Sequence, residues 1–171
     1  MRSAISRAAR RLSIIAFTVA FLVCSTIPAL AGEYPGLAGV KGLDSVFNFS
    51  LGTPAMAALV FPAIMDVYRN KEVRALHAAP RTVIVFHGRA IKLISTNRTG
   101  VDKEEAEVLD KVAGMIRQFK KDGVRMEVCM YAVKVLGVDP ATLMPEIDRV
   151  GNGFISVLSY QAQGYSVVTV P

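Results

Sequence analysis

Short apolar runs alternate with longer stretches of helical period over residues 45–171, and this alternation predicts an α/β domain. Thr82–Phe86, which is apolar and β-branched or aromatic after its first residue, is typical of a strand buried on both faces of a parallel sheet. Because helical segments separate the runs, we predict a doubly wound, mostly parallel five-stranded sheet flanked by helices. The predicted strands are residues 46–49, 82–86, 124–128, 147–150 and 165–170.

Start and stop signals place the helices between these strands. Thr53 is a candidate N-cap, and Pro54 follows it at the first helical position, where a missing N–H costs nothing. Asp102 with Glu105 three residues later forms a capping box for the helix with the clearest apolar face. The predicted helices are residues 53–68, 102–121, 130–136 and 154–161, with shorter turns after residues 88 and 139 and a turn at 151–153.

The N-terminal residues have the features of a signal peptide. Four arginines precede the apolar run 12–23, and Ala29-Leu30-Ala31 is the small-x-small pattern that leader peptidases cut after. We therefore predict a signal peptide over residues 1–31, an irregular glycine-rich arm over 32–44 and one domain over 45–171, in a periplasmic or secreted protein. An uncleaved anchor reaching residue 31 is the alternative.

The charge of the chain belongs mainly to this leader. It carries four of the 20 basic residues and none of the 14 acidic residues, which leaves 16 basic against 14 acidic residues in the predicted mature chain. A near-balanced charge excludes the basic surface that nucleic-acid binding requires. After leader cleavage the composition also predicts no attachment to a membrane.

Cys129 is the candidate for chemistry, with His87 as a candidate helper. Each residue is predicted to stand at the carboxyl end of a strand, where ligands and reactive groups gather in parallel sheets. Cys24 lies in the predicted leader, so Cys129 has no disulfide partner in the mature chain. The helix predicted after Cys129 would favour a thiolate at its N-terminus, and an imidazole can shuttle protons near neutral pH.

Three stretches of the chain resemble the DsrE/DsrF-like sulfur-relay family. They are "TVIVFHGRAIKLI", "GVRMEVCMYAVKVLGVD" and "VGNGFISVLSYQAQGYSVVTVP", in which Gln161, Gly164 and Tyr165 match the family's C-terminal end. The resemblance spans residues 46–171. It implies a doubly wound fold, assembly into homo-oligomeric trimers or hexamers, and a cysteine that carries sulfur as a persulfide between a donor and an acceptor thiol protein. Leu136 stands where the cytoplasmic carriers tend to have arginine.

Other interpretations of the same residues stay open. Cys129 is equally a buried small residue that lines the pocket of a non-catalytic oligomeric binding module, and His87 a hydrogen-bonded strand end. Met126, Cys129 and Met130 suggest a copper(I) site, but strand alternation should point Met126 and Cys129 to opposite faces. We predict no metal and no bound cofactor, and we assign His77 no function.

Overall fold

The computed structural model describes residues 33–76 and 78–171, so the predicted signal peptide and His77 lie outside the described residues. The features below belong to the compact unit formed by residues 36–171. Its strands are β1 (Ser45–Phe49), β2 (Thr82–Phe86), β3 (Arg125–Cys129), β4 (Asp148–Val150) and β5 (Ser166–Val170). They form one sheet in the order β4-β3-β2-β1-β5, with every pairing parallel. The predicted fold class is confirmed.

The helices follow the predicted segments closely. The α-helices are α2 (Pro54–Arg69), α3 (Lys71–Arg74), α4 (Lys103–Lys121), α5 (Met130–Val135) and α6 (Gly153–Ala162), and the 3-10 helices are η1 (Pro35–Leu37), η2 (Gly88–Lys92) and η3 (Pro140–Thr142). Within the described part of the chain, no helix combines the length and apolarity that crossing a bilayer requires.

Two predicted caps have different outcomes. Asp102 caps α4 as predicted, because its Oδ1 accepts a hydrogen bond from the backbone N–H of Glu105 at 2.8 Å. Thr53 precedes α2, but its side chain makes no capping hydrogen bond, so that part of the prediction is wrong. Pro54 lies at the start of α2 as predicted, where its fixed φ suits the first turn.

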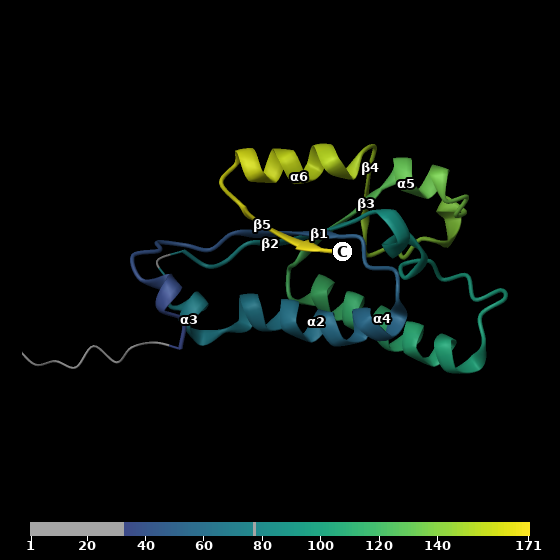
Figure 1. Cartoon of the computed structure of the whole chain (residues 1–171), viewed down its shortest axis with the longest axis horizontal. Helices are drawn as coiled ribbons and strands as arrows, with labels where there is room; N and C mark the ends of the chain where they lie inside the picture. Colours follow the sequence, from purple (N-terminus) through teal and green to yellow (C-terminus); the bar gives the residue numbers. More distant parts are fainter. Residues whose placement is uncertain (1–32, 77) are drawn as a thin grey trace, which may run out of the picture. The chain divides into compact units, whose positions relative to one another are not determined.

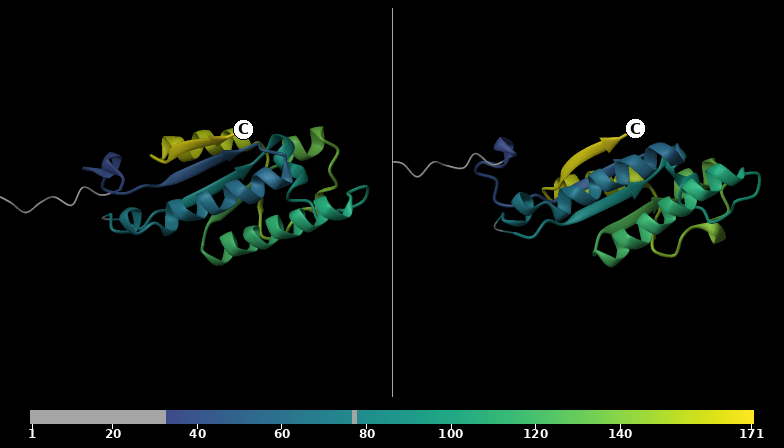
Figure 2. Two further views of the ribbon diagram at one scale, coloured as in Figure 1. Left: turned by 60° about the horizontal axis from the view of Figure 1, so that its bottom comes forward. Right: turned by 90° about the horizontal axis from the view of Figure 1, so that it is seen from below.

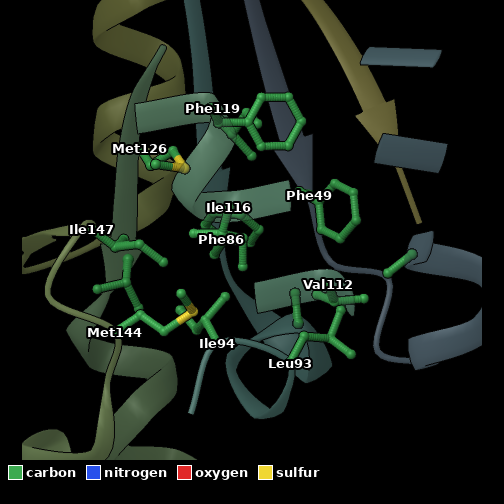
Figure 3. Packing of buried hydrophobic residues seen from close by; sticks show 14 of the residues in the cluster. Phe49, Phe86, Leu93, Ile94, Val112, Ile116, Phe119, Met126, Met144 and Ile147 are labelled. Atoms are coloured by element: carbon green, nitrogen blue, oxygen red, sulfur yellow. The ribbon is translucent and has the colours of Figure 1, made fainter. Parts of the chain in front are cut away.

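Helices cover the two faces of the sheet unequally. Figures 1 and 2 show α2 and α4 side by side on one side of the sheet, and Figure 1 shows α6 on the other, where it contacts β1, β2, β3 and β5. The face toward α2 and α4 holds the larger apolar cluster, which Figure 3 shows from close by. The face toward α6 buries a smaller cluster built from Val46, Val83, Val85, Val157, Tyr160 and Tyr165. The edge strand β5 has four exposed residues of five.

Four phenylalanines hold α2 and α4 to the sheet. The ring of Phe61 on α2 lies 5.2 Å from that of Phe49 and 5.2 Å from that of Phe119 on α4, centroid to centroid. The ring of Phe86 on β2 lies 6.3 Å from the Phe61 ring in an edge-to-face arrangement. Tilted and edge-to-face aromatic pairs add to the free energy gained by burial itself. Phe61 is therefore the residue through which α2, α4 and the sheet pack together.

We expect Phe61→Ala to lower the free energy of unfolding by about 3–5 kcal/mol, because it leaves a cavity among three other rings. Urea unfolding followed by circular dichroism checks this. Leu59 on the same helix is 70% exposed, so Leu59→Ala should change the free energy of unfolding by less than about 0.5 kcal/mol. Equal losses in the two variants would show that Phe61 is not central to the packing.

Candidate functional site

Cys129 is the last residue of β3 and directly precedes α5, as predicted. The Cys129 side chain faces α6, whereas Met126 and Val128 face the cluster under α2 and α4. Cys129 is the only free cysteine within the described residues, and it is 4% exposed. The side chain therefore lies at the carboxyl edge of the sheet but beneath a cover.

That cover is the first residue of α6. A Cβ atom added to Gly153 would lie 2.9 Å from Cys129 Cβ, 3.6 Å from Cys129 Sγ and 3.2 Å from a methyl group of Val85. The first of these distances is shorter than side chains tolerate, so glycine is required here by close approach. Gly153 lets the N-terminus of α6 rest directly on the cysteine.

His87 follows β2 at the edge of the sheet where Cys129 ends β3. Phe86 pairs with Val128 in the register of β2 and β3, so His87 and Cys129 occupy the next positions along each strand. Neighbouring parallel strands lie about 4.8 Å apart. Gly88, at φ 53°, then turns the chain away into η2. The two residues that the sequence singled out thus lie at the same edge of the sheet, each directly after the last residue pair of β2 and β3.

Contacts hold the His87 ring on the α6 side of the sheet. Its Nε2 lies 2.6 Å from Oδ1 of Asn48, on the neighbouring strand β1. The ring also meets Phe154 of α6 edge to face, with 5.3 Å between the ring centroids. Because Gly153 covers Cys129 and Phe154 contacts His87, two consecutive residues of α6 join both sides of the candidate site.

Partial burial lowers the pKa of His87 below its ordinary value. Burial penalises the charged imidazolium, so the neutral ring is favoured at neutral pH. If Nε2–H donates to Asn48 Oδ1, the lone pair that can accept a proton is on Nδ1. The folded protein therefore binds a proton at His87 less readily than the unfolded chain does. The stability that the neutral ring contributes is complete above the unfolded-state pKa, and it is lost as the pH falls from that value to the lower pKa of the folded state.

A second polar group anchors the other end of α6. Glu127 on β3 is 3% exposed, and its Oε1 accepts a hydrogen bond from the Tyr160 hydroxyl at 2.7 Å. Nε of Arg125 lies 3.0 Å from the same oxygen, while Oε2 has no hydrogen-bond partner among the described residues. Burial, followed by the bond to Glu127, raises the pKa of Tyr160 well above its usual range. This end of α6 is therefore tied to the sheet.

The copper hypothesis does not fit this arrangement. Met126 is buried in the core under α2 and α4, and Cys129 faces α6, so the predicted opposite orientation is confirmed. Side chains on opposite faces of a sheet cannot bind one ion together. No group of three or more histidine, cysteine or acidic residues within the described chain is placed to hold a metal ion.

Sequence reasoning missed Asn48, Gly153 and Phe154. Asn152 was assigned to a turn, although an asparagine before an apolar run is an N-cap signal, and its Oδ1 accepts from the Phe154 N–H at 2.9 Å. That signal predicts where α6 starts in the sequence, but no local pattern shows that its first residue packs against Cys129. Gln161 and Gly164, which match the family's C-terminal end, lie at and just after the far end of α6.

A comparison with protein-family models identifies the family of the chain. The model of the DsrE/DsrF-like family matches residues 47–170. The chain belongs to the DsrE/DsrF-like family. The resemblance that the sequence motifs indicated is thereby confirmed at the level of the family, which connects the chain with sulfur relay in that general sense.

The chain is also similar to solved structures. A protein of unknown function from Methanobacterium thermoautotrophicum, MTH1491, is 15% identical, with a TM-score of 0.58 and coverage of 75% of this chain and 99% of that chain. The ychN protein from E. coli is 11% identical, with a TM-score of 0.44 and the same coverage of both chains. The likeness to MTH1491 confirms the fold class. Curated proteins gave no significant match.

We expect the His87 ring protons to titrate below pH 6.5 in an NMR pH series, because the folded protein holds this ring partly out of water. Phe154→Ala removes the ring that contacts it and should raise the midpoint toward the ordinary value. His87→Gln identifies the resonance. A midpoint at or above the ordinary value in the native protein would contradict the burial argument.

Proposed function

We propose that this DsrE/DsrF-like protein carries sulfane sulfur as a persulfide on Cys129. The observation that carries the proposal is that Cys129 and His87 lie at the same carboxyl edge of the sheet and that each contacts the first turn of α6. Membership of a family connected with sulfur relay supports the same function. On this proposal the protein is a sulfur carrier or sulfurtransferase.

The transfer needs no external oxidant or reductant. The Cys129 thiolate attacks the outer sulfur of a donor persulfide or polysulfide, so a bond from Sγ to that sulfur forms and the donor's S–S bond breaks. The electron pair of the broken bond leaves with the donor thiolate. An acceptor thiolate then attacks the outer sulfur, the bond to Sγ breaks, and the Cys129 thiolate is regenerated.

His87 is the proposed proton acceptor for the thiol. A neutral imidazole can take the proton that Cys129 loses, and the lowered pKa of His87 keeps the ring neutral at neutral pH. Asn48 orients the ring through its bond to Nε2, which leaves Nδ1 as the basic nitrogen. This assignment gives Asn48 a positioning role.

Access to Cys129 requires movement of the first turn of α6. Gly153 lies against the thiol, and an added sulfur atom would need the space that Gly153 occupies. This turn is lightly held, because Phe154 and Ile155 are 61% and 64% exposed. The far end is tied through Tyr160 and Glu127, so the helix can lift at its N-terminus while it stays anchored.

One observation favours a second candidate function. Cys129 is 4% exposed, which suits a small buried residue as well as a thiol awaiting a partner. In that case the protein is a non-catalytic binding module, and the cysteine only lines a pocket. Sulfur loading separates the two functions, because only a carrier forms a covalent adduct.

We propose further that the protein acts after export, in the periplasm or outside the cell, and that residues 1–31 are removed. The donor and the acceptor are then thiol proteins or small sulfane compounds of that compartment. The near-balanced charge of the remaining chain gives no reason to expect a nucleic-acid partner or a membrane surface.

We expect the protein, expressed with its own N-terminus in a Gram-negative host and treated with polysulfide, to gain one sulfur that a reductant removes. Cys129→Ser should gain none, because no other thiol remains once Cys24 has left with the leader. Intact mass spectrometry measures both, and the same spectrum shows whether Gly32 is the first residue. His87→Gln should slow loading by about a hundredfold without lowering the final amount.

Two results would contradict the proposed sulfur carrier. A folded protein that gains no sulfur, with a Cys129 thiol that reacts with an alkylating reagent only after denaturation, would exclude the carrier and leave the binding module. An equal adduct on Cys129→Ser would mean that sulfur is held elsewhere.

We also propose that the chain forms a homo-oligomer, a trimer or a hexamer, through the outer face of α6. Phe154, Ile155 and Leu158 lie at helical spacing on this face and are each more than 60% exposed. Exposed apolar side chains gathered on one helix mark interaction surfaces. An interface here would also place a second copy above the candidate site.

We expect Leu158→Asp to shift the protein to a monomer in light scattering after size-exclusion chromatography, because a carboxylate cannot be buried unpaired at an apolar interface. Leu59→Asp on α2 makes the same change at a residue that is 70% exposed, and the oligomer should survive it. Loss of the oligomer only in Leu59→Asp would place the interface on α2.

A further inference from the structure

A cavity of about 660 Å³ opens at the edge of the sheet opposite Cys129. Its walls come from the starts of β2 and β3, the end of α2, α3 and the end of α6. From Arg125 to Cys129 the strand advances four residues, or about 13 Å at the usual rise. The cavity is therefore separate from the candidate sulfur site, and its volume is that of a small-molecule site.

Arginines dominate the charge of this cavity. Four of them line it, on four different elements or loops: Arg69, Arg74, Arg81 and Arg125. Asp122 is the one acidic residue among the described residues of the lining, and lysine and glutamate are absent from it. Asp44 and Glu127, which lie outside the lining, pair with Arg81 and Arg125, so Arg74 is the lining arginine whose charge no described carboxylate balances.

Three of the four guanidinium groups are held in place by carboxylates. Arg69 pairs with Asp122, Nε of Arg81 donates to Asp44 at 2.9 Å, and Nε of Arg125 lies 3.0 Å from Oε1 of Glu127. The Arg81 guanidinium also lies over the Tyr165 ring, 5.0 Å from its centroid. Each group is thus fixed before any ligand arrives, which lowers the entropy that binding would cost.

The ion pairs of Arg69 and Arg81 leave one nitrogen of each guanidinium group free to donate to a ligand. The bonds of Arg69 and Arg81 to carboxylates use Nε and Nη2, so within the described residues Nη1 of each has no hydrogen-bond partner. Arg74 on α3 makes no ion pair with any described residue. Arginine presents its donors in a planar fork that matches the two oxygens of a phosphate or carboxylate group.

We propose that this cavity binds a small polyanion, a molecule with at least two phosphate or carboxylate groups. A single anionic group would contact one or two of the arginines, whereas two linked groups can reach guanidinium groups on separate walls. Arg74, whose charge no described carboxylate balances, is the residue on which binding depends most. This site is independent of the proposed sulfur chemistry at the other edge.

Isothermal titration calorimetry with pyrophosphate tests the proposal at low ionic strength. We expect binding to the protein with a Kd below about 1 mM, weakened about tenfold in Arg74→Gln because one charged hydrogen-bonding group is lost. Arg74 makes no ion pair in the described structure, so this variant should unfold at the same urea concentration as the native protein. Lys111→Gln, an equal charge change on the exposed face of α4 outside the cavity, should leave the Kd unchanged.

The other outcomes of the titrations also support or overturn the proposed site. Citrate that binds with the same dependence on Arg74 supports the polyanion class, and the tighter of the two probes identifies phosphate or carboxylate as the preferred group. Orthophosphate that binds as tightly as pyrophosphate would overturn the need for two linked groups. No heat from either probe, or equal weakening in Lys111→Gln, would overturn the site itself.

Discussion

A parallel sheet needs cover on both faces, and here the two faces receive unequal cover. Two long helices, α2 and α4, pack an aromatic core against one face, while α6 alone lies across the other. Glu127, the Asn48–His87 pair and the Cys129 thiol lie on the face that α6 covers. The helix that completes the cover of the sheet, α6, therefore also covers the candidate site.

The two ends of α6 differ in how firmly they are held. Tyr160 donates to a buried carboxylate at one end, and an unpaired buried charge would be costly, so this contact resists separation. At the other end Gly153 packs against Cys129, Phe154 meets the His87 ring edge to face, and the carbonyl of Gly151 accepts a hydrogen bond from the N–H of Tyr131 at 3.0 Å. The proposed access to the thiol therefore depends on the N-terminal end of α6, where Gly153 covers Cys129.

The opposite edges of the sheet have opposite chemical characters. The carboxyl edge has a buried thiol, an imidazole and an amide beneath the N-terminus of α6. The amino edge has four guanidinium groups around an open cavity, which suits hard oxygen anions. Because β3 contributes both Arg125 and Cys129, the two sites share a strand but not a surface.

The sequence by itself determined the order of elements and the class of fold, because strand composition and helix periods are local signals. It placed Asp102 as a cap and put Cys129 and His87 at strand ends. It also led to the family through three motifs. It did not show that Asn48 holds His87, that Gly153 lies on Cys129, or that arginines from residues 69 to 125 line one cavity. Those contacts join residues far apart in the chain, and only the pairing of β1, β2 and β3 and the crossing of α6 bring them together.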